Sequence, residues 1–291
     1  MPLLALIAVT AVWGVTFVQV QDALGLYPLF AFLAVRFAIS AVVLAPFAWR
    51  PVRRLPRQGV VAGVGVGLLL AAAYGLQTAG LELTTVSSTG FITGLYVVFT
   101  PLIALVLFGT RVATVVWLGV ALAVAGLLLL SGVPGGSTTG NALVLANAVA
   151  QSFQIAAMER FAPRYDARAL TFLQMATSCV GFTVIALAVG EVEIPRGWTV
   201  WGALLVTGIF AGALGYLIAT WVQSRTTAAR AALVFTLEAP FAALFGVLLA
   251  DEVLGWIGWT GCAVMLAGIV LAEPAAASTL RRMVPPRGRA A

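Results

Sequence analysis

Apolar residues run through this chain in ten long stretches separated by short polar gaps. The stretches cover roughly residues 3–21, 28–49, 58–80, 85–109, 112–131, 141–159, 168–190, 198–222, 227–250 and 254–272. A helix of about 20 residues is about 30 Å long, which matches the hydrocarbon core of a bilayer. Runs such as 118–130 lack the alternation of polar and apolar residues that a lipid-facing barrel strand needs. The pattern therefore predicts ten transmembrane helices.

The composition agrees with this class. Of the 291 residues, 62% are hydrophobic and 9% are charged, and the mean hydropathy is +1.08. Soluble domains carry about 25% charged residues, so no soluble domain of ordinary composition fits within this chain. We predict an all-α polytopic membrane protein whose main partner is the lipid bilayer.

The sixteen basic residues are all arginines, and they predict the orientation. Fourteen lie in alternate gaps or in the C-terminal tail: Arg50, Arg53, Arg54, Arg57, Arg111, Arg160, Arg164, Arg168, Arg225, Arg230, Arg281, Arg282, Arg287 and Arg289. Only Arg196 lies in the opposite gaps, and Arg36 lies within a stretch. Because positive charge stays on the cytoplasmic side, both termini are expected in the cytoplasm. The net charge of +6 thus reflects topology, and we expect no nucleic-acid partner.

The two halves of the chain resemble each other at an offset of 142 positions. Trp117, Gly119, Ala121, Ala125 and Gly126 recur as Trp259, Gly261, Ala263, Ala267 and Gly268. Because each half has five stretches, the second must enter the membrane in the opposite sense, an arrangement typical of secondary transporters. We predict two inverted five-helix repeats, 1–131 and 141–273, joined by a periplasmic loop at 132–140. A basic cytoplasmic tail follows at 274–291.

Polar side chains share single faces of several stretches, at the three- and four-residue spacing of a helix. Those expected to line a central cavity are Tyr74, Gln77, Thr93, Tyr96, Asn147, Gln151, Gln154 and Tyr216. The alternative is that they only hold helices together by hydrogen bonds, each worth about 0.6 kcal/mol. The fifth and tenth stretches have almost no polar content, so we expect them to support the bundle from outside the cavity.

Two ionisable residues, Arg36 and Glu238, lie deep in the predicted helices. Each costs about 2.5 to 3.5 kcal/mol to insert, so each needs a partner, a hydrated cavity or a function. They could pair with each other, and Arg36 could instead extend to the interface. Alternatively, one or both could contact a charged or zwitterionic substrate, or Glu238 could titrate during transport.

Pro101 and Pro240 lie inside the fourth and ninth stretches, at roughly corresponding places in the two halves. A proline removes one backbone hydrogen bond and bends a helix. We predict that both are hinges, with a static kink that shapes the cavity as the alternative.

Several local motifs resemble the EamA-type branch of the drug/metabolite transporter superfamily. They are Trp13-Gly14 with Phe17, Pro28 followed by Arg36-Phe37, the segment 230–241 with Glu238 and Pro240, Asp251-Glu252, and the glycines between 261 and 268. The resemblance covers the chain to about residue 273. It implies a ten-helix metabolite carrier in a bacterial inner membrane, similar to exporters of aromatic and neutral amino acids.

These observations lead us to expect a secondary carrier that exports amino acids by alternating access, acts without a cofactor and is a monomer. Trp13 and three tyrosines would contact an apolar side chain, while amides and hydroxyls hold the polar groups. A multidrug, metabolite or lipid transporter of the same fold is the main alternative, and a channel is a weaker one. A membrane enzyme is disfavoured because the chain has no histidine for a zinc site or a catalytic triad. Coupling to protons through Glu238 and uncoupled flux both remain open.

Overall fold

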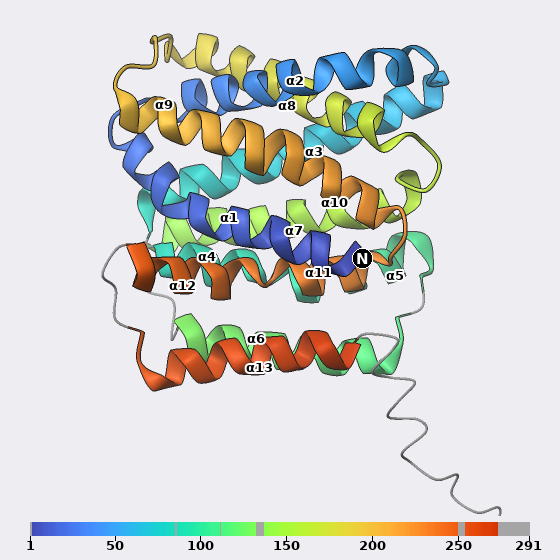
Figure 1. Ribbon diagram of the computed structural model, residues 1–291, viewed down its shortest axis with the longest axis vertical. Coiled ribbons are helices and arrows are strands. Elements are labelled where there is room, and N and C mark those ends of the chain that lie inside the picture. The colour runs from blue at the N-terminus through green and yellow to red at the C-terminus, as the bar shows by residue number, and fades with distance from the viewer. Residues whose placement is uncertain (1, 85, 111, 132–136, 250–253, 273–291) are drawn as a thin grey trace, which may run out of the picture.

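The computed structural model describes residues 2–84, 86–110, 112–131, 137–249 and 254–272. Every regular element in these ranges is a helix (Figure 1). The elements are α1 (Pro2–Leu24), α2 (Leu29–Arg53), α3 (Arg57–Leu83), α4 (Val86–Gly94), α5 (Tyr96–Phe108), α6 (Thr114–Ser131), α7 (Thr138–Phe161), α8 (Ala167–Val189), α9 (Trp198–Leu205), the π-helix η1 (Val206–Gly215), α10 (Tyr216–Gln223), α11 (Ala228–Phe235), α12 (Glu238–Leu249) and α13 (Trp256–Ala272).

Some of the predicted features lie outside the described residues. They are Arg111, the pair Asp251-Glu252, the tail 274–291, and residues 132–136 of the junction loop. The remaining part of that loop begins α7, where the Ser137 side chain accepts a hydrogen bond from the Gly140 amide.

Seven helical runs are long and apolar enough to cross a membrane. They are Leu4–Leu24, Leu29–Arg53, Arg57–Leu83, Ser88–Phe108, Ala167–Val189, Trp198–Gln223 and Ala228–Phe245. Two further apolar helices, Thr114–Leu130 and Trp256–Ala272, are shorter. The 24-residue α7 is the least hydrophobic of the long helices and is not among the seven. A multi-pass membrane protein is thus supported, while the count of ten spans stays a prediction.

The turns that carry most of the described arginines lie at one end of the bundle. The connections α2–α3, α7–α8 and α10–α11 lie at the end that also holds the N-terminus (Figure 1). This common placement is what the distribution of arginines predicts for a cytoplasmic face.

Two of the predicted helices are each broken into two shorter ones. The stretch 85–109 is interrupted at Leu95, and the stretch 227–250 at Thr236 and Leu237. Pro240 explains the second break, because it has no N–H to donate to the Thr236 carbonyl, which accepts from the Ala239 amide at 3.2 Å instead. Pro101 lies inside α5, beyond the break at Leu95. Leu95 and Leu237 are 142 positions apart, so the breaks correspond in the two halves.

The run α9–η1–α10 contains a ten-residue π-helix in its middle. Its glycines allow close contact with α2: a Cβ at Gly208 would lie 2.8 Å from the Ile39 side chain and 3.1 Å from the Arg36 carbonyl oxygen. The Ser40 hydroxyl donates to the Gly208 carbonyl at 2.7 Å. π-Helices are rare and often occur at functional sites.

α6 and α13 form a tight pair along one side of the bundle (Figure 1). A Cβ at Gly119 would lie 2.7 Å from the Gly268 oxygen, and a Cβ at Gly261 would lie 2.6 Å from the Gly126 oxygen. Backbone therefore touches backbone at both glycine pairs, the packing that small residues permit in membranes. The placement agrees with the expected supporting role.

Candidate functional site

A central cavity lies between the two halves of the chain and consists of two chambers that share Trp13, Tyr74, Gln77 and Glu238. The other lining residues are Thr16, Phe17, Val20, Arg36, Thr78 and Leu81 in the first chamber and Thr93, Tyr96, Asn147, Gln151, Ile155, Tyr216 and Phe235 in the second. Ten of the eleven residues predicted to bind substrate are therefore brought together here. That they bind substrate stays a prediction.

Gln154 is the predicted residue that lines neither chamber. It is buried between α7 and α8, where its amide nitrogen donates to the Gln174 side-chain oxygen at 2.9 Å. Its own oxygen accepts weakly from Gln151 at 3.4 Å. Helical spacing placed Gln154 and Gln151 on one broad face, but only the packing of α8 reveals that Gln154 is turned away from the cavity.

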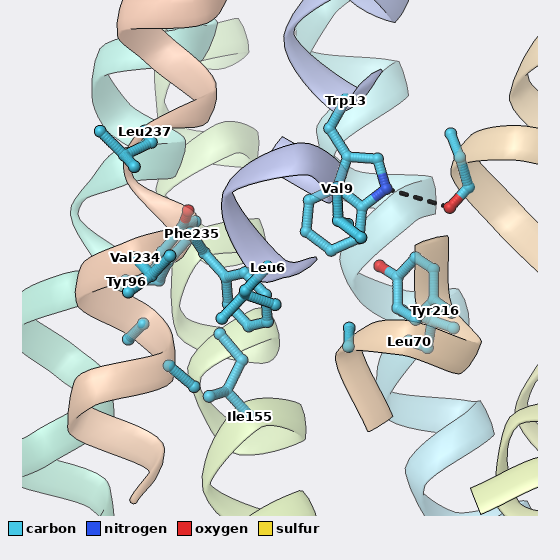
Figure 2. Packing of buried hydrophobic residues seen from close by; sticks show 14 of the residues in the cluster. Leu6, Val9, Trp13, Leu70, Tyr96, Ile155, Tyr216, Val234, Phe235 and Leu237 are labelled. Carbon is cyan, nitrogen blue, oxygen red and sulfur yellow. Dashed lines mark hydrogen bonds between the residues drawn. The ribbon is translucent and has the colours of Figure 1, made fainter. Parts of the chain in front are cut away.

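The aromatic wall of the cavity centres on Trp13. Its ring centroid lies 5.2 Å from that of Tyr216 and 5.3 Å from that of Phe235 (Figure 2). Its indole N–H donates to the Ala211 carbonyl in η1 at 3.0 Å, the bond drawn in Figure 2. Phe235 was not among the residues predicted to line the cavity. It is the last residue of α11, and the break at Thr236 and Leu237 separates it from Glu238 in α12.

Tyr74 and Tyr216 meet across the cavity, where the Tyr216 hydroxyl donates to the Tyr74 hydroxyl at 3.2 Å. The two residues are 142 positions apart, the same offset that relates the two halves. Tyrosines at corresponding positions of α3 and α10 therefore contact each other at the centre of the bundle.

The Arg36 side chain is buried, with 5% exposure, and its guanidinium reaches the cavity. Its carbon Cζ lies 4.6 Å from the centroid of the Tyr74 ring, and its Nη2 donates to the Tyr74 hydroxyl at a long 3.4 Å. Its Nε has no hydrogen-bond partner in the described structure. A buried guanidinium has five N–H donors to satisfy, so most of its capacity to bind an anion is unused.

Glu238 is the first residue of α12, directly after the break in the ninth predicted helix. Tyr96 occupies the corresponding place as the first residue of α5, and both line the second chamber. The N-terminus of a helix carries partial positive charge, which stabilises a carboxylate there. Within the described residues, Glu238 accepts no hydrogen bond and forms no ion pair with Arg36, so of the alternatives left open by the sequence, mutual pairing is not the one formed there.

The polar wall of the second chamber is held together by Thr93. The Thr93 hydroxyl accepts hydrogen bonds from the Gln77 amide nitrogen at 3.2 Å and from the Asn147 amide nitrogen at 3.1 Å. These bonds join α3, α4 and α7. Gln77, Thr93 and Asn147 therefore line the cavity and also hold helices together by hydrogen bonds, so both roles expected from the sequence apply to them.

Each chamber has a volume of about 30 Å³. This is about the space of one or two water molecules, whereas ligand pockets occupy about 300–1,000 Å³. The structure is therefore closed around the polar and aromatic groups and leaves no room for a ligand of ordinary size.

The fold and the site define a polytopic helical membrane protein with a polar and aromatic cavity between its halves. Comparison with known proteins gives the family. The sequence model of the EamA-like transporter family matches residues 1–132 and 138–272, so the chain belongs to this family. An uncharacterized transporter from Archaeoglobus fulgidus is 31% identical over 269 residues, covering 92% of this chain and 84% of the relative. A protein of known crystal structure has the same fold, with a TM-score of 0.78, 19% identity, and coverage of 96% of this chain and 98% of that one.

Proposed function

We propose that this transporter exports amino acids, aromatic and large neutral ones in particular, across the bacterial inner membrane by alternating access through the central cavity. The observation that carries the proposal is the presence of a basic and an acidic side chain, Arg36 and Glu238, in one buried cavity without an ion pair between them. An amino acid is a zwitterion whose carboxylate suits a guanidinium and whose ammonium group suits a carboxylate. Each buried charge would thereby obtain the partner that burial demands.

The aromatic wall supports the choice of side chain. Trp13, Tyr216 and Phe235 line the second chamber together with its polar groups, and their rings are in contact. Aromatic pairs are worth about 0.5–1.5 kcal/mol beyond the area they bury, so these rings favour an aromatic or large apolar substituent over a small one.

Alternating access and the inverted repeat are supported by correspondences between the two halves. Tyr74 pairs with Tyr216, the helix breaks fall at Leu95 and Leu237, and the glycine contacts of α6 and α13 are reciprocal. The family profile also matches in two blocks of similar length on either side of the junction. Transporters built from such repeats place their site where broken helices meet and move one half against the other.

The experiment measures uptake into liposomes that contain the purified protein, with three labelled probes. L-Phenylalanine carries both charges, phenethylamine lacks the carboxylate, and 3-phenylpropionate lacks the ammonium group. Loss of one charge-assisted hydrogen bond costs about 1.5–3 kcal/mol, which is roughly a 10- to 150-fold change in affinity. We expect Arg36→Gln to raise the half-saturation concentration of phenylalanine by that factor and to leave phenethylamine nearly unchanged. Glu238→Gln should weaken phenylalanine and spare 3-phenylpropionate.

Arg53→Gln is the matched control, because Arg53 is exposed and stacks on the Trp49 ring at 4.3 Å, away from the cavity. It should transport like the wild type. If the wild type takes up no amino acid, the substrate class is wrong. If Arg36→Gln weakens all probes equally while the protein elutes as a folded monomer, Arg36 does not recognise the carboxylate.

A further inference from the structure

A groove of about 620 Å³ lies between the N-terminal half of α3 and the C-terminal end of α7. Its floor is apolar and includes Val61, Gly65 and Leu69 of α3 with Ala157 and Phe161 of α7. The three α3 residues are spaced by four and therefore share one face of the helix. A Cβ placed on Gly65 would meet no atom within 4 Å, so the glycine leaves open space above the floor. The groove is large enough for part of an acyl chain.

Three arginines, Arg57, Arg160 and Arg164, line one end of this groove, and no acidic residue lines it. All three are exposed, and within the described part of the chain none of them makes an ion pair. Arg160 lies over the Phe108 ring at 5.8 Å, a contact that leaves its N–H groups available. The end of the groove is therefore positively charged and unneutralised.

A second groove at the same end of the bundle provides a contrast. It has a volume of about 700 Å³ and contains Asp166, Arg168 and Arg225. Arg168 forms an ion pair with Asp166 at 2.8 Å, and Arg225 donates to the Trp221 carbonyl at 2.8 Å. Because both arginines already have partners within the protein, this second groove has fewer free N–H donors and less net positive charge with which to bind an anion.

We propose that the groove between α3 and α7 binds one anionic phospholipid, with an acyl chain on the apolar floor and the phosphate at the three arginines. The arginine end coincides with the bundle end that holds the N-terminus, where the charge distribution places the cytoplasmic headgroup layer (Figure 1). Basic pockets between helices at that level suit anionic headgroups. The apolar floor would contribute nothing to binding a small soluble anion, which is why a lipid is the occupant. This site is separate from the central cavity and does not depend on the proposed substrate.

The test uses native mass spectrometry of the full chain, delipidated in neutral detergent and titrated with phosphatidylglycerol or phosphatidylcholine of the same chain length. The wild type should retain one phosphatidylglycerol more tightly than phosphatidylcholine. Each arginine near a headgroup contributes roughly a fivefold gain in affinity. We therefore expect Arg160→Gln with Arg164→Gln to weaken phosphatidylglycerol about 25-fold and to change phosphatidylcholine little.

Gly65→Leu tests the floor separately, because a Cβ there meets no atom within 4 Å, the side chain then occupies the groove, and no charge is removed. It should weaken the binding of both lipids. The matched control is Arg53→Gln with Arg54→Gln, two exposed arginines at the same membrane surface but outside the groove. This pair should leave the retained lipid unchanged.

Three outcomes would overturn the proposal. The control pair could weaken phosphatidylglycerol as much as the groove pair, which would mean unspecific attraction to the surface. Soluble glycerol phosphate could compete with the lipid at equal concentration, which would make the site one for free anions. Finally, Gly65→Leu could abolish a dimer while lipid binding stays the same, which would make a second copy of the chain the occupant.

Discussion

The contact between α6 and α13 leads to a strong prediction about stability. Gly261 of α13 faces the backbone of α6, and a Cβ there would lie 2.6 Å from the Gly126 oxygen and 2.7 Å from the Leu130 nitrogen. Both are backbone atoms that cannot rotate away. Gly261→Ala must therefore push the two helices apart rather than displace a side chain.

The size of the effect follows from these distances. Ordinary van der Waals contact begins near 3.4 Å, so a gap of several tenths of an ångström must open along the pair. Overpacking of this kind costs about 1–3 kcal/mol, against a gain of up to about 1 kcal/mol when alanine replaces glycine in a helix. Gly202→Ala isolates the gain alone, because a Cβ at Gly202 in α9 meets nothing within 4 Å.

The assay is thermal unfolding of the purified protein in detergent, followed by size-exclusion chromatography. A change of 1 kcal/mol shifts Tm by about 2–4 °C in a chain of this size, so Gly261→Ala should unfold about 5 °C below Gly202→Ala. Substrate affinity should be unchanged in both variants, because α6 and α13 contribute no residue to the central cavity. Equal Tm values for the two variants would show that the helices are not in backbone contact.

Two further predictions concern the cavity and the α7–α8 turn. Tyr74→Phe removes a hydroxyl that accepts hydrogen bonds from both Arg36 and Tyr216, so we expect it to raise the half-saturation concentration of phenylalanine uptake about fivefold. Tyr216→Phe removes only the bond to Tyr74 and should raise this concentration about twofold. Equal effects of the two variants would contradict this ranking. At the α7–α8 turn, the hydrogen bond from the Arg168 side chain lowers the pKa of Asp166 below its usual range. The ionised Asp166 should therefore stabilise the folded protein above the ordinary pKa of about 4, and this contribution should disappear as the pH falls through the lowered pKa. Because the pair is partly exposed, Asp166→Asn should cost about 1 kcal/mol or less at pH 7 and nothing at the acid extreme, as unfolding curves at both pH values would reveal.

Much of the site could be inferred from helical spacing. Tyr74 and Gln77 are three residues apart, as are Thr93 and Tyr96, and all four line the cavity. The spacing of a helix determines which residues share a face, but it does not determine which neighbour that face meets. Gln154 illustrates the limit, since it shares a broad face with Gln151 yet bonds to Gln174 of α8. The break at Leu95 also has no local signal as clear as Pro240 is for the break at Leu237.

The amino-acid sequence by itself determined the class of the protein and its predicted orientation, because hydrophobicity and the placement of arginines act residue by residue and need no partner. The tertiary structure decided what the deep charges do. Arg36 and Glu238 are about 200 positions apart in the chain, and no periodicity could tell whether they form an ion pair or lie separately in one cavity. That outcome depends on how α2 and α12 pack against the helices between them, since a buried charge takes whichever partner the packing brings within reach.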